Sequence, residues 1–516
     1  MNEEPKNIRE KSHKGRSAVF VLACLVTLIA LFYAEEDWRG WHAWQKFKHQ
    51  WEAKGEKFDF ASVVPPPVPD DQNFALTPIV ASSYLRVMDK SGHQIQPPND
   101  NVVDRLKMAV VHNDDVVKDG VGNWQKSTVS DLKVWQQYYR AVAAKTNEFS
   151  VSAQLQSPAD DVLLALSKYD PAIEELRQAS ELPASRFPLE YDKEDPTGIL
   201  LPHLAALKRC SQVLQLRAIA ELQNGQSDKA LDDVKLVLRL TEAIHTEPFL
   251  ISHLVRIAML QIMLQPVWEG LAEHRWSEEQ LVALDAKLMK LDFLADYKLS
   301  MRGEFTHHDV AIENWHRHPE QIFFYSGDND NGRVMPFPAR IAWRLIPNGW
   351  FYQNRLRCAR MVVEFYIPLA DTNQEVISPT ATRHADAVVE ADTKHRNPYN
   401  MIEILLLPAL GKATERFAYG QESVDLARVA IALERYRLAH GEYPQSLDVL
   451  VPQFIAGLPH DIINGQPLNY RRTADDRFVL YSVGWNETDD DGEVGLKENG
   501  SVDINTGDWV WRYPAK

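Results

Sequence analysis

The chain is poor in cysteine, has no excess of positive charge and holds only one long hydrophobic run. Three cysteines among 516 residues exclude a fold built on disulfides. Lys and Arg number 56 against 72 Asp and Glu, for a net charge of −16. No basic stretch supplies the phosphate-neutralising surface of a nucleic-acid-binding protein, so we expect no nucleic-acid partner. The length predicts two to four folding units at about 150 residues each.

Recognisable catalytic motifs are missing as well. The sequence contains no nucleophile elbow, no phosphate-binding glycine loop, no H-E-x-x-H zinc motif and no dinucleotide-binding fingerprint. The composition, 45% hydrophobic and 25% charged, is that of a globular protein and excludes a disordered or multi-span membrane chain. The sequence therefore favours a non-enzymatic protein, and an enzyme would need a site without a recognisable motif.

The hydrophobic run covers residues 17–34, SAVFVLACLVTLIALFYA, and contains no charge. At about 1.5 Å per residue the run is about 27 Å long, which matches the hydrocarbon core of a bilayer. Basic residues precede it and acidic residues follow it, so the positive-inside rule predicts a cytoplasmic tail and an outward-facing remainder. The basic residues are Lys6, Arg9, Lys11, Lys14 and Arg16, and the acidic residues are Glu35, Glu36 and Asp37.

Two alternatives to an uncleaved anchor are weaker. A cleaved signal peptide needs a small residue where Phe32 stands. Val21 to Cys24 resembles a lipoprotein box, but ten uncharged, mostly apolar residues follow it. In an oxidising compartment Cys210 and Cys358 would be able to pair, and the sequence alone leaves this open.

An aromatic stripe follows the hydrophobic run. Trp38, Trp41, Trp44, Phe47 and Trp51 recur at steps of three or four residues, which places them on one face of a helix. Because tryptophan favours the lipid headgroup layer, we expect this helix to lie at the membrane interface. Packing of the stripe against the protein's own body is the alternative.

A stiff proline-rich spacer at 62–69 and an irregular segment precede a long helical stretch. Apolar residues at helical spacing predict antiparallel helices from 131 to 305. Within this stretch, residues 216–240 resemble one tetratricopeptide-type helical hairpin, although no 34-residue period repeats. The predicted helices are 131–146, 158–168, 171–180, 200–223, 227–246, 249–273, 277–291 and 293–305.

The order of motifs after Glu422 is distinctive. A helix ends at Gly441 and is followed by a G-x-Y-P turn, two short alternating strands and an acidic loop. This segment of about 90 residues resembles the globular domain of the major pseudopilin of type II secretion systems. The residues that carry the resemblance are Gly441, Tyr443, Pro444, Asp461, Gly465, Pro467, Tyr470, Tyr481, Ser482, Gly484, the run Ser501 to Ile504, and Trp509.

The resemblance implies a small domain of one helix and an antiparallel sheet, in a protein linked to a secretion or pilus-like system. The chain lacks the family's Gly-Phe-Thr-Leu-x-Glu leader, and it has Ser501 in place of an Asp and Ile462 in place of a Pro. The resemblance therefore implies a borrowed C-terminal module rather than a filament subunit. With the anchor, it implies a bacterial inner-membrane location, single-pass, with the bulk of the chain in the periplasm.

The acidic loop of this segment implies a calcium site. Ca²⁺ prefers six to eight oxygen ligands, which clustered carboxylates in glycine-allowed turns supply. Glu487, Asp489, Asp491 and Glu498 also follow an EF-hand-like spacing, although a predicted strand precedes the loop. A solvated acidic turn is the alternative, and repulsion among the carboxylates argues against it. The expected metal ligands are Ser482, Glu487, Asp489, Asp491, Glu498 and Asp503.

A second cluster lies at residues 304–318. Glu304 with His307, and Glu313 with His316, each follow an E-x-x-H pattern, which puts a carboxylate and an imidazole on one helix face. Helical bundles bind transition metals in this way, but a di-iron site needs carboxylates from four helices. A histidine-rich surface without metal is the favoured interpretation, and metal binding stays open.

Together these patterns predict a protein of the α+β class that is predominantly α. We expect an anchored scaffold or interaction protein with a calcium-stabilised C-terminal domain, whose partners are the membrane and envelope or secretion-system proteins. The alternative is a membrane-tethered periplasmic hydrolase with a site in residues 300–398. The predicted divisions are a cytoplasmic tail at 1–16, a transmembrane helix at 17–34, an aromatic juxtamembrane helix and linker at 35–69, an irregular segment at 70–130, an antiparallel helical body at 131–305, an irregular connecting region at 306–398 and a pseudopilin-like domain at 399–516.

Overall fold

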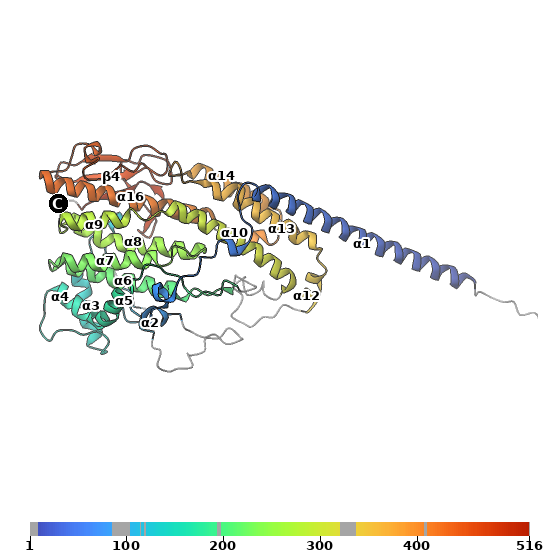
Figure 1. Ribbon diagram of the computed structural model, residues 1–516, viewed down its shortest axis with the longest axis horizontal. Coiled ribbons are helices and arrows are strands. Elements are labelled where there is room, and N and C mark those ends of the chain that lie inside the picture. The colour runs from blue at the N-terminus through green and yellow to red at the C-terminus, as the bar shows by residue number, and fades with distance from the viewer. Residues whose placement is uncertain are drawn as a thin grey trace, which may run out of the picture.

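The computed structural model describes residues 9–84, 104–113, 115–117, 120–192, 198–319, 337–406 and 410–514. These residues are mostly helical, with a small C-terminal antiparallel sheet and a long N-terminal helix, as predicted. Figure 1 shows this helix projecting from one end of an elongated body, with the sheet toward the opposite end. The first eight residues of the predicted tail, and parts of both segments predicted as irregular, lie outside the described residues.

Helix α1 (Arg9–Glu52) is unbroken and contains both the hydrophobic run and the aromatic stripe. Its side chains from 16 to 32 are all exposed, and it is long and apolar enough to cross a membrane. Its second half lies along α13 (Asn348–Arg360). The other described helix that is both long and apolar enough, α8 (Leu250–Ala272), has 61% of its apolar window buried, so it is a core helix of the body.

The aromatic stripe divides into a buried and an exposed part. Trp44 and Phe47 are 2% and 5% exposed and pack against Phe58. The expectation of an interfacial stripe is therefore wrong for these two residues. At about 1.5 Å per residue Trp44 lies about 15 Å beyond the apolar run, further than the headgroup layer reaches. Trp38 and Trp41, nearer the run, are 64% and 47% exposed.

All eight helices predicted for the body are present. Consecutive helices joined by short turns pack against each other, as α6 does with α7 and α7 with α8 (Figure 1). The last of them continues well past its predicted end at 305. The eight are α3 (Leu132–Ala143), α4 (Pro158–Leu166), α5 (Asp170–Ala179), α6 (Pro202–Gln223), α7 (Ser227–Glu242), α8 as above, α9 (Glu278–Leu288) and α10 (Phe293–Arg317), and the short helix α2 (Pro78–Ala81) precedes them.

The expectation of an irregular region at 306–398 is wrong for its described residues, which form further helices. These helices bury polar side chains on inner faces, and this breaks the single apolar stripe that a sequence pattern needs. Arg355, for example, pairs with Asp309 inside the fold at 2.6 and 2.7 Å. The elements are α12 (Phe337–Arg344), α13, a π-helical turn (Met361–Tyr366), the strands β1 (Ala370–Asp371) and β2 (Val376–Ile377), α14 (Pro379–Thr393) and, just beyond, α15 (Glu403–Leu406).

The C-terminal segment contains the predicted helix and antiparallel strands. Helix α16 (Leu410–His440) ends at Gly441, whose φ of +85° is in the left-handed region that glycine tolerates. The sheet has the order β3-β4-β7, and β5 and β6 form a separate hairpin. The strands are β3 (Asn469–Arg472), β4 (Phe478–Ser482), β5 (Val494–Leu496), β6 (Val502–Gly507) and β7 (Trp509–Arg512).

The C-terminal segment shares one hydrophobic core with the helical body. Helix α16 contacts α8, α9 and α10 as well as β4 and β7. The rings of Trp511 and Trp124 lie 5.2 Å apart, and Trp268 Nε1 donates to the Arg512 carbonyl at 3.0 Å. The segment 399–516 is therefore built onto the body rather than tethered to it.

Candidate metal centre

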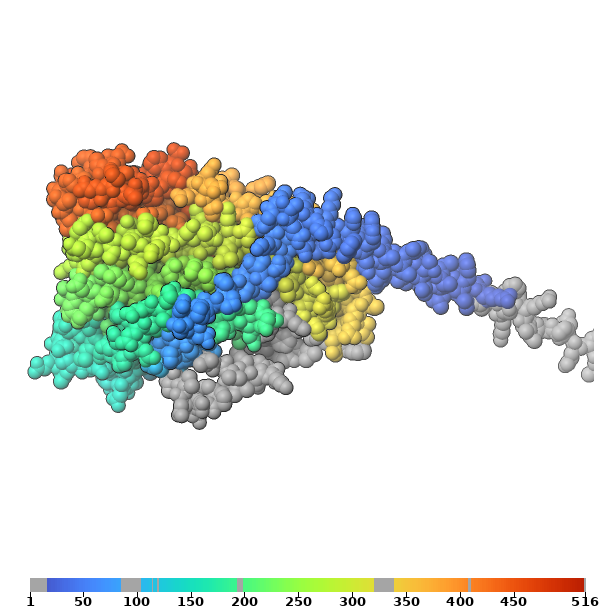
Figure 2. All heavy atoms as spheres, in the orientation of Figure 1, coloured from blue at the N-terminus to red at the C-terminus, as the bar shows by residue number. Residues whose placement is uncertain are grey.

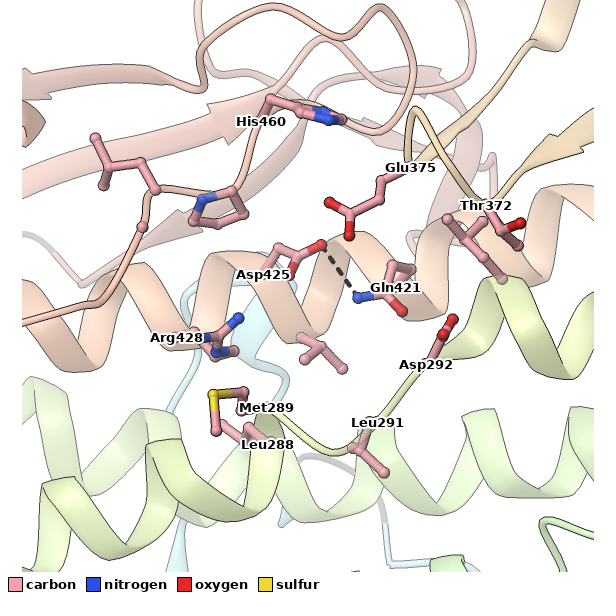
Figure 3. Close-up of a pocket in the computed structure, with 15 residues that line it drawn as sticks. Leu288, Met289, Leu291, Asp292, Thr372, Glu375, Gln421, Asp425, Arg428 and His460 are labelled. Atoms are coloured by element: carbon pink, nitrogen blue, oxygen red, sulfur yellow. Dashed lines mark hydrogen bonds between the residues drawn. The ribbon is translucent and has the colours of Figure 1, made fainter.

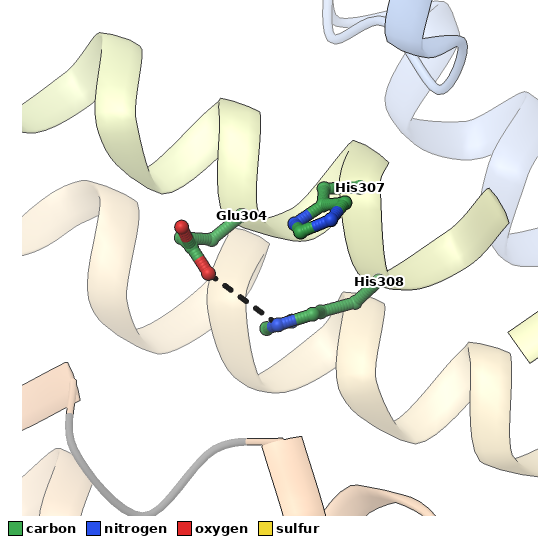
Figure 4. Close-up of side chains that lie close together, drawn as sticks. All are labelled: Glu304, His307 and His308. Carbon is green, nitrogen blue, oxygen red and sulfur yellow. Dashed lines mark ion pairs between the residues drawn. The ribbon is translucent and has the colours of Figure 1, made fainter. Parts of the chain in front are cut away.

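Three metal-ligating side chains converge on α10. Glu304, His307 and His308 follow i, i+3, i+4 spacing, which places them on one helix face. Their ligand atoms all lie within 4.8 Å of one another, and they form the only such group in the part of the chain that the structure describes. Glu304 Oε2 lies 3.4 Å from His308 Nε2, and Figure 4 shows these two side chains pointing toward each other. The E-x-x-H pattern does not include His308. Its spacing of four residues from Glu304 is the feature of the sequence that places it on the same helix face.

The segment before α8 fixes the carboxylate of Glu304. Its Oε1 accepts a hydrogen bond from the backbone N–H of Leu250, the first residue of α8, at 3.2 Å. Gly303 permits this close approach, because a Cβ there would lie 1.6 Å from the Pro248 carbonyl oxygen. The N-terminus of a helix also favours a negative charge. One carboxylate oxygen is thus held by α8, and the other faces the histidines.

Aromatic rings enclose the imidazoles. The ring centroid of His307 lies 6.2 Å from that of Phe60 and 6.1 Å from that of Phe249. Burial, together with the neighbouring His307, lowers the pKa of His308 to about 3, so its imidazole is neutral at neutral pH. Burial raises the pKa of Glu304 to about 7. Neutral imidazole is the form that binds metal ions, and a nearby cation would favour the charged carboxylate.

The second E-x-x-H pair lies away from this cluster. Nine residues separate the two pairs, about two and a half helical turns, so they face opposite sides of α10. Glu313 pairs with Arg317 at 2.6 Å and with Arg355 at 3.3 Å. His316 packs on Phe351 with 4.1 Å between ring centroids. The two pairs therefore do not form a joint site.

Two of the predicted calcium ligands hold the acidic loop to its surroundings. Ser482 is buried, and its hydroxyl donates to Asp461 Oδ1 at 2.9 Å. Glu487 points toward α14, where it accepts a hydrogen bond from Thr380 at 2.7 Å and pairs with Arg383. Both side chains are therefore engaged in protein contacts.

Asp489 and Asp491 are neighbours in the acidic loop. Asp489 Oδ1 accepts hydrogen bonds from the Asp491 backbone N–H at 2.9 Å and from the Tyr481 hydroxyl at 3.1 Å. The Asp491 side chain is 89% exposed and pairs with Arg471 at 2.8 Å. The positive charge of Arg471 thus offsets part of the repulsion among the carboxylates, on which the prediction of a calcium ion rests.

The last two predicted ligands lie on the β5–β6 hairpin. Glu498 is exposed in its turn, and Asp503 on β6 accepts a hydrogen bond from the Asn505 backbone N–H at 3.2 Å. The structure brings Asp489 and Asp491 together, but no three carboxylates of the predicted set form a group of converging ligand atoms within the fully described stretch 482–503. The calcium site stays a prediction.

Sequence reasoning missed the buried acid of this loop. Asp508 is 1% exposed and accepts hydrogen bonds from the backbone N–H groups of Asp490 and Gly492, at 3.1 and 2.6 Å. Burial raises the pKa of Asp508 to about 6. Its carboxylate thus joins two backbone N–H groups of the acidic loop to the residue that precedes β7. No spacing pattern in the sequence indicates this contact.

An acidic cavity of about 350 Å³ lies between α16, the loop 457–460 and the connection from α9 to α10 (Figure 3). Asp292, Glu375 and Asp425 contribute carboxylates to its lining. Gln421 donates to Asp425 at 3.2 Å, and burial raises the pKa of Asp425 to about 7. The volume suits a small molecule, although Asp292 already serves as the N-cap of α10. The cavity is a polar surface feature without converging ligand atoms.

Comparison of the chain with protein-family models, with curated proteins and with solved structures gave no match. Its function is therefore argued from its residues and their contacts.

Proposed function

We propose that this protein is a membrane-anchored, outward-facing envelope protein that serves as a scaffold or interaction protein. The observation that carries the proposal is the division of α1 into an exposed apolar half and a second half docked on α13. Figure 2 shows the apolar half standing clear of the body. Soluble proteins rarely leave so long an apolar surface uncovered, so a bilayer is the solvent that fits residues 17–34.

The docked half of α1 supports a rigid connection between membrane and body. Glu36 is 5% exposed and accepts hydrogen bonds from Trp350 Nε1 at 3.0 Å and from the Tyr399 hydroxyl at 3.1 Å. Asp37 accepts a hydrogen bond from the backbone N–H of Gly349, in the first turn of α13, at 2.8 Å. An anchor that continues into the body as one helix would hold the body at a fixed distance from the bilayer.

The charge distribution supports the orientation. Basic residues precede the apolar run, and the net negative charge of the chain is carried by the part that follows it. We therefore place the N-terminus in the cytoplasm and the body in the periplasm of a bacterial cell. The sheet of the C-terminal segment, which we propose is pseudopilin-like, lies toward the end far from α1 (Figure 1), where it would meet envelope or secretion-system proteins.

Protease accessibility and co-purification test this proposal. Protease added to right-side-out spheroplasts should degrade the body, and inverted membrane vesicles should protect it. The reverse pattern would contradict the outward orientation. After cross-linking in cells, the solubilised full chain should retain an envelope partner in stoichiometric amount, and recovery of the chain alone would contradict the scaffold role.

A membrane-tethered periplasmic hydrolase with a site in residues 300–398 is the second candidate. The cluster of Glu304, His307 and His308 favours it, because a carboxylate beside imidazoles supplies general acid–base groups or metal ligands. Hydrolysis of a substrate panel that His307→Ala abolishes and His316→Ala leaves intact would favour this enzyme over the scaffold.

A further inference from the structure

We propose that Glu304, His307 and His308 bind one first-row transition-metal ion, with Zn²⁺ as the best match, and leave one coordination position open. The inference goes beyond the scaffold role and does not depend on it. It rests on three observations: the spacing of the ligand atoms, a largely buried carboxylate that has no arginine or lysine partner among the described residues, and the chemical types of the donors.

The ligand atoms are close to a metal-binding arrangement. Tetrahedral Zn²⁺ with bonds of about 2.1 Å holds its ligand atoms about 3.4 Å apart. Glu304 Oε2 and His308 Nε2 already lie 3.4 Å apart, and the whole set lies within 4.8 Å. Because the three residues share adjacent turns of one helix, a rotation of the His307 side chain closes the set without moving the backbone.

The carboxylate of Glu304 lacks a basic partner. Within the described residues the one side chain of a basic type near it is His308, whose imidazole is neutral, and no arginine or lysine reaches it. Its Oε1 is oriented by the N–H of Leu250, the role that outer-sphere groups play in metal sites, and Oε2 is left toward the imidazoles. A buried carboxylate in this setting is stabilised by a cation placed beside it.

The imidazole of His308 points to the same conclusion. The ring is 2% exposed, and within the described residues its Nδ1 has no hydrogen-bond partner. The other ring nitrogen, Nε2, faces Glu304 Oε2 at 3.4 Å, and a metal ion bound by both atoms would give this buried ring a strong polar contact. Glu304 therefore has a second role besides accepting the hydrogen bond from the first residue of α8.

The donor set selects the ion. Two imidazoles and one carboxylate suit Zn²⁺ and Co²⁺, whereas Ca²⁺ and Mg²⁺ prefer an all-oxygen shell. Zinc sites with three protein ligands keep a fourth position for water or another ligand. Glu304 retains 18% exposure of its side chain, which gives an ion access to the cluster.

Metal titration of the detergent-solubilised full chain tests the proposal. The chain, purified through a tag without histidine and stripped with a chelator, is titrated with Zn²⁺ by calorimetry and with Co²⁺ by visible absorption. We expect one equivalent of Zn²⁺ to bind, and the intense visible bands of four-coordinate Co²⁺ to appear and then vanish as Zn²⁺ displaces it. Absence of saturable binding to the wild-type chain would overturn the proposal.

Matched variants locate the site. Glu304→Gln keeps an oxygen for the Leu250 N–H, and together with His307→Gln it should weaken Zn²⁺ binding at least tenfold. Glu313→Gln and His316→Gln alter the second E-x-x-H pair on the opposite face of the same helix and should bind as the wild type does. Circular dichroism of each variant confirms that it is folded. Equal Zn²⁺ affinity in both pairs of variants would overturn the assignment, and neither result bears on the membrane anchor.

Discussion

Gly40 of α1 and Gly349 of α13 meet backbone to backbone. A Cβ on Gly40 would lie 2.3 Å from the Gly349 carbonyl oxygen, and a Cβ on Gly349 would lie 2.0 Å from the Glu36 carbonyl oxygen. Two glycines therefore let the anchor helix approach the body closely enough for Asp37 to reach the N-terminal turn of α13. This contact is where α1 becomes part of the folded body.

Gly349→Ala should separate the two helices. The added methyl group overlaps the backbone of α1, and overpacking of this kind costs about 1–3 kcal/mol. Alanine is the better helix former, so any loss of stability reports the contact with α1 and not the propensity of α13. Thermal unfolding of the solubilised chain measures the loss. Gly457→Ala is the control, because nothing lies within 4 Å of that position, and equal melting of the two variants would contradict the docking described here.

The pH dependence of stability should reveal the buried carboxyl of Glu403. Burial, with Asp392 as a second cause, raises the pKa of Glu403 from 4.5 to about 8. A group whose folded-state pKa is raised stabilises the fold fully below its unfolded pKa, and this stabilisation is lost as the pH rises through the folded pKa. Through this group the free energy of unfolding should thus fall by about 2–4 kcal/mol between about pH 5 and pH 8.

Glu403→Gln should make the total decline shallower by about 2–4 kcal/mol, since the amide stays neutral at every pH. Glu304 and Asp425, whose pKa values are also raised, keep their share of the decline. Denaturant unfolding at a series of pH values measures the profile for each variant. Glu390→Gln, which changes an exposed carboxyl on α14, should keep the wild-type profile. A Glu403→Gln profile that declines as steeply as the wild type would show that Glu403 is not the group responsible.

Calcium should stabilise the acidic loop if the predicted site exists. An ion that binds only the folded chain adds about 2.7 kcal/mol at a hundredfold excess over its dissociation constant. Asp491→Asn replaces a charged carboxylate ligand with a weaker, neutral amide oxygen and also relieves repulsion, so it should lower the melting temperature with calcium and raise it slightly with chelator. Asp476→Asn is the matched control, because Asp476 also has a positive φ and an arginine partner, Arg472 at 2.6 Å. Identical melting of the wild type with calcium and with chelator would leave a solvated acidic turn.

Truncation should separate the anchor from the docked half of α1. A chain that begins at residue 61 lacks Trp44, Phe47 and Phe58 and leaves Phe305 of α10 uncovered. We expect this chain to aggregate, as measured by size-exclusion chromatography, whereas a chain that begins at Glu35 keeps these contacts and stays monodisperse. Monodisperse material from both chains would show that the docked half is dispensable.

Residue spacing along the chain predicted the helices and turns whose formation depends on nearby residues. The apolar run, the helices of the body and the end of α16 at Gly441 follow from residue spacing and from one glycine that takes a positive φ. The burial of Trp44 was not predictable, because Arg355 of α13, whose guanidinium lies 4.9 Å from the centre of the Trp44 ring, comes some 300 residues further along the chain. The helices within 306–398 were missed because buried pairs such as Asp309 with Arg355 break the apolar period.

The two candidate sites also differ in how far the local sequence determines them. The i, i+3, i+4 spacing on one helix brings Glu304, His307 and His308 together. This proximity follows as soon as the segment is predicted to be helical. The acidic loop depends on partners from other elements, since Arg471 on β3 and Arg383 on α14 pair with its carboxylates. Spacing within the loop gives no information about such partners.

Membrane fractionation tests the central claim, that α1 anchors a body to which it is rigidly joined. The full chain and a chain that begins at Glu35 are expressed side by side, and membranes are washed at alkaline pH to remove peripheral proteins. The account predicts that the full chain stays in the membrane pellet and that the shortened chain is recovered folded in the soluble fraction. Release of the full chain by the wash, or retention of the shortened chain in the pellet, would contradict it.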